Sequence, residues 1–121
     1  MKTIIAGSRL GVHFGQVVGA VAAAVRAGIV PTEVASGCAD GVDQLGEQLA
    51  RLWHLPVRQF PADWKRYGRA AGRQRNLQMA VYAEALIAVW DGKSPGTRHM
   101  IETAMRMGLK VFVYRTDLEH A

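Results

Sequence analysis

The segment from Ala85 to Trp90 is an almost unbroken apolar run, Ala-Leu-Ile-Ala-Val-Trp. A short run of this kind predicts a strand that is buried on both faces, as in a parallel sheet covered by helices. Parallel strands cannot be joined by tight hairpins, so the chain must place crossover connections, usually helices, between them. This one strand therefore favours an α/β fold.

The rest of the chain alternates strand-like and helix-like segments in the way this fold requires. The predicted strands are Lys2 to Ala6, Glu33 to Ser36, Val57 to Phe60, Ala85 to Trp90 and Lys110 to Tyr114. The predicted helices are Phe14 to Ala27, a segment that begins near Gly41, Gly72 to Ala83, and Gly96 to Met107, with a long loop from Pro61 to Ala71. We expect a Rossmann-like, three-layer α/β/α domain with a doubly wound parallel five-stranded sheet. Right-handed crossovers favour the strand order 3-2-1-4-5.

Length and composition narrow the class of protein further. The chain of 121 residues fits one domain, residues 1–121, and half of its residues are hydrophobic. Its single cysteine, Cys38, has no partner for an internal disulfide, which fits a reducing cytosol. No apolar run approaches the ~20 residues of a membrane helix, and the segment Met1 to Gly7 resembles an opening strand more than a signal peptide. We therefore expect a cytoplasmic protein without a membrane partner.

Positive charge is concentrated in one part of the chain. The chain has 15 Lys and Arg residues against 10 Asp and Glu residues. Six of the basic residues lie in a stretch whose single acid is Asp63: Arg58, Lys65, Arg66, Arg69, Arg73 and Arg75. Such a cluster suits a phosphate-bearing partner, although a solvated basic loop that aids solubility is an equal alternative.

Three glycine-rich turns follow predicted strands: Gly7 to Gly11, Ser36 to Asp43, and Asp91 to Thr97. The carboxyl ends of parallel strands share one edge of the sheet, so these turns should converge on one cleft. Glycine lets backbone amides approach a phosphate closely, and the following helix adds its positive end. The alternative is that all three are merely tight strand-to-helix turns.

Familiar nucleotide motifs do not match. Gly92-Lys93-Ser94 resembles the end of a P-loop, but the first glycine of that motif would fall at Ile87, inside a predicted strand. The turn Gly7 to Gly11 lacks the G-x-G-x-x-G spacing and no acid ends the second strand, which argues against a standard NAD-dependent dehydrogenase. Four histidines are scattered without metal-ligand spacing, so we expect no zinc site and no cofactor: His13, His54, His99 and His120.

Several segments together resemble a known family. They are Ile4 to Arg9, Ser36 to Asp43, Phe60 to Lys65, Gly68 to Gly72, Arg75 to Met79 and Trp90 to Thr97. On these segments the chain resembles the SLOG superfamily, named for the SMF/DprA and LOG proteins, and most closely its YspA, cpYpsA-related branch. The resemblance implies a Rossmann-like fold that binds nucleotides or nucleotide derivatives. Within the superfamily, LOG proteins hydrolyse nucleoside monophosphates to release the base, other members are thought to sense nucleotide signals, and DprA proteins bind single-stranded DNA.

The LOG hydrolase pattern is only partly present. It pairs an arginine, which Arg75 matches, with a glutamate shortly after Gly-Thr. Here Gly96-Thr97 is present, but the nearest acid, Glu102, lies two residues too far along the helix, and Ser94-Pro95 replaces a Gly-Gly pair. If the chain is an enzyme, we expect catalysis from Asp91, Glu102 and Arg75, with Asp91 the better placed carboxylate. The departure weakens the case for hydrolysis more than the case for binding.

The predicted ligand-binding set spans all of these segments. It consists of Gly7, Ser8, Arg9, Gly37, Gly41, Asp43, Asp63, Trp64, Arg69, Arg75, Asn76, Asp91, Ser94, Gly96 and Thr97. We expect Ser8 and Arg9 to bind a phosphate or ribose, and Thr97 to be both a phosphate ligand and the N-cap of its helix.

For other residues of this region a structural role competes with a functional one. Asp43 could hold a ribose hydroxyl or a reacting water, or stabilise its own helix end. Trp64 could stack on a base or anchor its loop to the core. Arg75 and Asn76 could engage phosphate and base edges, or form an exposed pair. Asp40 is predicted as the N-cap of the second helix.

These observations lead to three functional hypotheses. The first is a binding module for a nucleotide or nucleotide-derived molecule, acting as a sensor or accessory protein. The second is a hydrolase of the N-glycosidic bond in nucleotides, and the third is a single-stranded nucleic-acid binder. The Val-rich first helix and the helix that carries Met100, Met105 and Met107 are candidates for a homodimer interface.

Overall fold

The sheet has the predicted strand order. The computed structural model describes residues 1–119, so the predicted scattered histidine His120 lies outside the described residues. Five parallel strands run in the order β3-β2-β1-β4-β5. The strands are β1 (Lys2–Gly7), β2 (Glu33–Ser36), β3 (Val57–Gln59), β4 (Ala85–Trp90) and β5 (Lys110–Arg115). The prediction of a Rossmann-like doubly wound sheet is confirmed.

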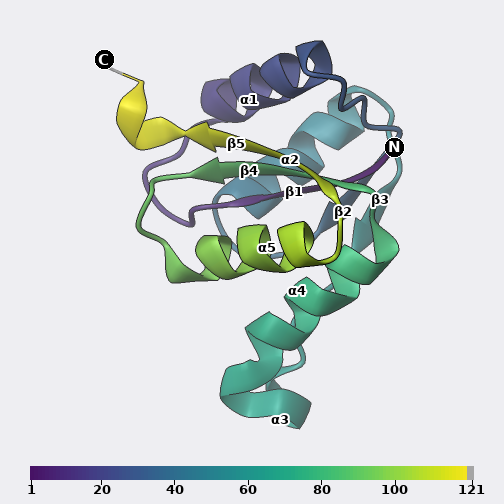
Figure 1. The fold of residues 1–121 in the computed structure, drawn as a ribbon, viewed down its shortest axis with the longest axis vertical. Helices are drawn as coiled ribbons and strands as arrows, with labels where there is room; N and C mark the ends of the chain where they lie inside the picture. The colour runs from purple at the N-terminus through teal and green to yellow at the C-terminus, as the bar shows by residue number, and fades with distance from the viewer. Residues whose placement is uncertain (120–121) are drawn as a thin grey trace.

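Helices cover both faces of this sheet (Figure 1). They are α1 (Phe14–Arg26), α2 (Val42–Leu52), α3 (Trp64–Tyr67), α4 (Ala71–Tyr82) and α5 (Pro95–Arg106), with short 3-10 turns at Gly68–Ala70 and Thr116–Leu118. One core cluster joins α1 and α2 to the sheet face that carries Ile5. A second cluster joins α4 and α5 to the opposite face, which carries Ile4. Successive strand residues point to opposite faces, so β1 supplies both cores at once.

The centre of the sheet is fully buried. Residues 85–89 of β4 are 0% exposed, and Ile5 of β1 lies in register with Ile87 of β4. The apolar run that predicted a strand covered on both faces is therefore the central strand of a covered parallel sheet. No helix within residues 1–119 has the length and apolar character needed to cross a bilayer.

The connection between β3 and α4 differs from the prediction. The expected loop from Pro61 to Ala71 contains the helix α3 and a 3-10 turn, and it projects from the body of the molecule together with the start of α4 (Figure 1). The carboxylate of Asp63 caps α3 by accepting a hydrogen bond from the amide of Arg66 at 3.1 Å. A four-residue helix is too short to show hydrophobic periodicity, so only this cap could have revealed it.

Two predicted helix caps are wrong. The N-cap of α2 is Gly41 rather than Asp40; it has a φ of +78°, and a side chain there would collide with the backbone of Ser8 and Arg9. The N-cap of α5 is Ser94 rather than Thr97, because Pro95 occupies the first helical position, where its missing amide costs nothing.

Some apolar residues of α1 and of the segment from α5 to Met107 are buried in the core, and others are exposed. Met100 is 1% exposed and belongs to the core, whereas Met105 is 64% and Met107 46% exposed. On α1, Val17 and Val21 are buried. The homodimer interface expected over these helices stays a prediction.

Candidate functional site

A cavity of about 530 Å³ lies at the carboxyl ends of the strands. Each glycine-rich turn contributes to its wall, and α3, α4 and α5 close the remaining sides. The lining residues are Ala6, Gly7, Arg9, Leu10, Ala39, Asp43, Trp64, Arg69, Gly72, Arg73, Arg75, Asn76, Met79, Asp91, Ser94, Pro95, Gly96, Thr97, His99 and Met100. The predicted convergence of the three turns is confirmed, and the volume is typical of a small-molecule site.

Ser8 holds these turns together from behind the cavity wall. Its side chain is 1% exposed and accepts a hydrogen bond from the amide of Asp91 at 3.1 Å. Its carbonyl accepts from the amide of Val42 at 3.1 Å, and its amide donates to the carbonyl of Val89 at 3.0 Å. Ser8 therefore links the first turn to α2 and to β4. Ser8 itself does not line the cavity.

Asp91 organises the third turn. Its carboxylate accepts hydrogen bonds from the amides of Lys93 and Ser94, both at 2.8 Å, and from the hydroxyl of Ser94 at 3.0 Å. The two amide bonds, that of Ser94 foremost, lower the pKa of Asp91. An ionised carboxylate that is already engaged by its own turn is a poor proton carrier.

Asp43 belongs to the first turn of α2 and is only 5% exposed. The amide of Ala39 donates to its Oδ2 at 3.3 Å. Burial raises the pKa of Asp43 to about 6, and the Ala39 amide together with the charge of Arg75 opposes that rise. Asp43 is therefore a cavity carboxylate that titrates near neutral pH.

Arg75 on α4 reaches across the cavity floor to the second turn. Its guanidinium donates to the carbonyl of Gly37, and its Nε donates to Oδ1 of Asn76 at 3.1 Å. A Cβ on Gly37 would lie 2.7 Å both from a guanidinium nitrogen of Arg75 and from Oδ2 of Asp43. Glycine is thus needed at position 37 because both side chains occupy the space beside it. Asn76 is only 6% exposed, so the alternative of an exposed Arg–Asn pair is wrong.

His99 is a cavity residue that the sequence did not single out. Its Nδ1 lies 3.0 Å from Nδ2 of Asn76, and burial lowers its pKa, with the charges of Arg73 and Arg106 adding to the effect. In the tautomer that carries its proton on Nε2, the ring can accept a hydrogen bond from the Asn76 amide through Nδ1. Its position in the first turns of α5, just after the third glycine-rich turn, is the one sequence feature that could have indicated it.

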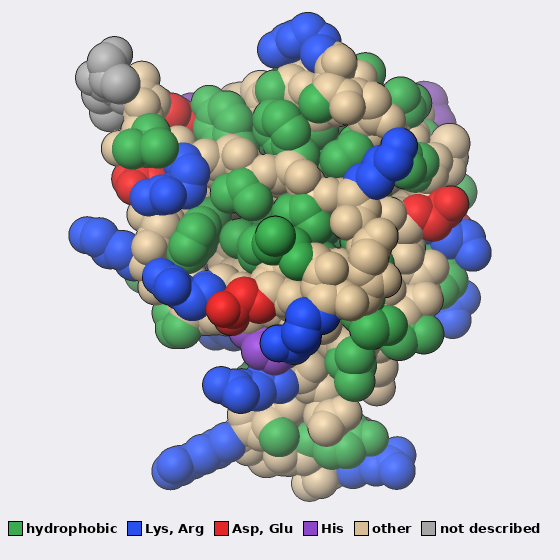
Figure 2. Space-filling view, in the orientation of Figure 1, with side chains coloured by type: hydrophobic (Ala, Val, Ile, Leu, Met, Phe, Trp, Pro, Cys, Tyr) green, Lys and Arg blue, Asp and Glu red, His purple; other side chains and the backbone are tan. Residues whose placement is uncertain are grey.

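The mouth of the cavity is basic and carries an aromatic ring. Arg9, Arg69 and Arg73 line it. Among residues 1–119 the ion pairs are Arg51–Glu47 and Arg115–Asp117, so none of these three arginines is paired. Trp64 lines the same cavity and is 57% exposed, so the alternative that it anchors its loop to the core is wrong. Figure 2 shows basic side chains projecting on both sides of the end of the molecule formed by α3.

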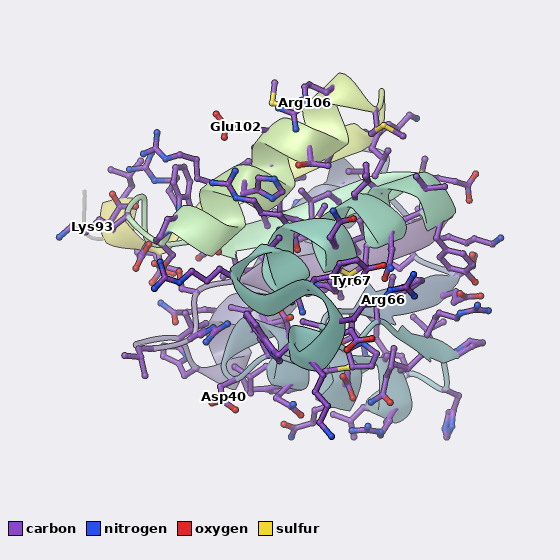
Figure 3. The ribbon with its side chains drawn as sticks, turned by 90° about the horizontal axis from the view of Figure 1, so that it is seen from below. Asp40, Arg66, Tyr67, Lys93, Glu102 and Arg106 are labelled. Atoms are coloured by element: carbon purple, nitrogen blue, oxygen red, sulfur yellow. The ribbon has the colours of Figure 1, made fainter. Side chains whose placement is uncertain are left out.

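Some predicted residues lie outside the cavity. Glu102 is exposed on α5 and points outward, away from α4 (Figure 3). Asp63 caps α3 and lines a neighbouring cavity of about 220 Å³. Gly37 and Gly41 shape the wall through the close contacts described above. Within residues 1–119, no group of three or more His, Cys, Asp or Glu side chains is placed to hold a metal ion.

Comparison with known proteins shows a sequence similarity to a phage protein. No known family profile matches the chain, and no solved structure matches it. The chain is 30% identical over 118 residues to the Gene 61 protein of Mycobacterium phage D29, which covers 91% of this chain and 93% of the phage protein. The chain therefore belongs to the family of the phage D29 Gene 61 protein.

Proposed function

We propose that the chain binds a nucleotide or nucleotide-derived molecule in the cavity at the carboxyl ends of the strands, as a sensor or accessory protein. The observation that carries this proposal is the charge of the wall. Four arginines line it against two carboxylates, and Arg9, Arg69 and Arg73 have no anionic partner among the described residues. Unpaired arginines gathered at one cavity favour an anionic ligand, and their planar forks suit a phosphate.

The remaining lining suits the other parts of a nucleotide. Ala6, Met79 and Met100 form an apolar floor, on which a base could pack. Trp64 offers an exposed ring at the same cavity, and base–aromatic stacking contributes about 1–3 kcal/mol. The resemblance to the SLOG superfamily supports the same class of ligand.

An N-glycosidic hydrolase is the second candidate, because two carboxylates lie on the cavity wall. Glu102 is not one of them, so this reaction would depend on Asp91 or Asp43 together with Arg75. Single-stranded nucleic-acid binding is the third, supported by the basic side chains around α3. The two are distinguished by product release and by affinity that falls steeply with salt.

A thermal-shift screen tests the proposal. AMP, cyclic AMP, NAD and ADP-ribose are added to the purified chain, and every mixture is then chromatographed for free base. At a hundredfold excess over Kd a ligand stabilises the fold by about 2.7 kcal/mol, which raises Tm by several degrees. The result that contradicts the proposal is an unchanged Tm with all four compounds.

Variants of two arginines show whether binding occurs in this cavity. Arg73→Met removes an unpaired charge from the wall, and we expect it to reduce the ligand-induced rise in Tm. Arg26→Met is the matched control, because Arg26 is exposed in the last turn of α1 and is not part of the lining. An equal loss of response in both variants would place the binding elsewhere.

A further inference from the structure

Asp43 is a buried acid inside a basic cavity, and its hydrogen bonds come from the main chain. It is 5% exposed, and its carboxylate accepts a hydrogen bond from the amide of Ala39. No Lys or Arg nitrogen within residues 1–119 comes within 4.0 Å of it. A carboxylate offers about four acceptor positions, so the Ala39 amide leaves Asp43, which lines the cavity, with unused acceptor capacity.

The charged and titratable groups around Asp43 come from several elements. Arg9 belongs to the turn after β1, Arg75 to α4, and Cys38 to the turn after β2. Glu47 lies one turn further along α2. Arg75 is already engaged by the carbonyl of Gly37, and Asp43 remains without a side-chain donor in spite of these neighbours.

The charged groups of the cavity therefore differ in what they can bind. The arginines attract anionic oxygens, whereas a phosphate oxygen in contact with the Asp43 carboxylate would meet a like charge. A carboxylate in this position accepts hydrogen bonds from neutral donors of a ligand. The neutral donors that a nucleotide carries close to its phosphate are the hydroxyl groups of its ribose.

We propose that Asp43 accepts hydrogen bonds from the ribose hydroxyls of the ligand, so that the cavity selects ribonucleotides over nucleotides that lack these hydroxyls. The inference rests on the proposed function, because it assigns a chemical group of the ligand to one side of the same cavity. It also gives a role to a buried acid that lies among the arginines of the wall, since a bare phosphate or pyrophosphate beside Asp43 would meet a like charge.

The decisive experiment compares AMP with 2′,3′-dideoxy-AMP on the unaltered chain by isothermal titration calorimetry. The two ligands share base and phosphate and differ only in the hydroxyl donors. We expect AMP to bind at least about tenfold more tightly, because hydrogen bonds to a charged group are among the stronger ones. We expect pyrophosphate to bind more weakly than AMP.

Two variants assign the preference to Asp43. Asp43→Asn keeps the shape of the side chain but removes its charge, and we expect the ratio of the two affinities to fall to about one. Asp40→Asn is the matched control, because Asp40 carries the same charge in the same turn, is exposed and is not part of the cavity lining. It should keep the preference for AMP.

The preference also depends on pH. The pKa of Asp43 is raised to about 6, so acidification below pH 6 protonates this acceptor. We expect the ratio of AMP to dideoxy-AMP affinity to fall as the pH drops through 6. The phosphate groups of both ligands titrate alike, so their ionisation cancels in the ratio.

The outcomes separate the two proposals. If neither AMP nor its dideoxy analogue binds and no nucleotide of the screen does, the proposed function fails and this inference fails with it. If both bind equally well to the unaltered chain, the inference alone is overturned. It is also overturned if Asp43→Asn keeps the preference. The ligand comparison on the unaltered chain decides the question even if that variant does not fold.

Discussion

Helix α2 carries two buried acids, one in its first turn and one in its second, and they differ in how the fold holds them. Glu47 is 1% exposed and accepts hydrogen bonds from the hydroxyl of Ser36 at 2.6 Å, from Arg51 at 3.0 Å and from Gln59 at 3.0 Å. Asp43 is 5% exposed and accepts from the amide of Ala39, with no side-chain donor among residues 1–119. The two carboxylates thus share one helix and nearly equal burial, but within the described part of the chain only Glu47 has side-chain donors.

The difference indicates which acid stabilises the fold and which acid we propose to contact a ligand. Buried polar groups that serve the fold are satisfied by their neighbours, and Glu47 meets that description. Asp43 lines the cavity, lacks side-chain donors, and has a pKa raised by burial. A buried acid without side-chain donors lowers the stability of the fold. Such destabilising groups are common at binding and catalytic sites.

The largest effect is expected from Glu47→Ala. This variant removes the carboxylate that accepts from the buried hydroxyl of Ser36 and from the side-chain amide of Gln59, a residue that is itself exposed. The free energy of unfolding should fall by about 4 kcal/mol, because the variant removes the acceptor of a buried hydroxyl and leaves a cavity where the buried side chain of Glu47 had packed. Urea unfolding measures it, with Glu47→Gln as the milder control. An unchanged urea midpoint for Glu47→Ala would show that Glu47 does not stabilise the fold, and would contradict the difference drawn between Glu47 and Asp43.

The second prediction concerns the stability cost of Asp43. Because its pKa is raised from 3.8 to about 6, the folded chain keeps a proton that the unfolded chain has lost in that interval. The unfolded state then binds fewer protons, so this residue makes stability fall as pH rises from about 4 to about 6. Asp43→Asn abolishes this effect. Between pH 4 and pH values above 6, the free energy of unfolding of the variant should therefore rise by about 3 kcal/mol relative to that of the original chain.

This comparison is read from urea unfolding of both chains at several pH values. Other titrating groups contribute to both chains alike and cancel in the difference. Asp40→Asn serves again as the control, since it removes an aspartate from the same turn at an exposed position. A difference between Asp43→Asn and the original chain that stays constant from pH 4 to pH 7 would contradict the account.

The smallest effect is expected from Arg51→Ala. Arg51 pairs with Glu47, but its side chain is 65% exposed, and exposed pairs at this helical spacing contribute about 0.5 kcal/mol or less. The other two donors to Glu47, the buried Ser36 and the exposed Gln59, remain in place. A loss of several kcal/mol in urea unfolding would show instead that the ion pair, and not these two donors, holds Glu47.

The fold could be predicted from the sequence because its determinants are local. The apolar run of β4 and the alternation of strands and helices specified the layers, and the rules for crossovers then specified the strand order. The error at the start of α2 arose where a contact with a distant residue decided the local structure. Gly41 replaced Asp40 as a cap because the backbone of Ser8 and Arg9 approaches it closely.

The site could be predicted only in outline. The three glycine-rich turns predicted at which edge of the sheet the site lies. The roles of single residues depend instead on contacts between distant segments. Arg75 bonds to Gly37, 38 positions away, and Asn76 bonds to His99, 23 positions away. No spacing in the sequence announces such pairs, so His99 was missed and Ser8 was expected to bind a ligand directly.

The chain has one cysteine, and it lies in the turn whose carbonyl holds Arg75. Cys38 has a left-handed φ of +64°, and partial burial raises the pKa of its thiol. A fluorophore attached at this sole thiol would label the protein at one defined position beside the cavity. The fluorescence of this label could then be used to follow the binding and release of a ligand in the cavity in real time.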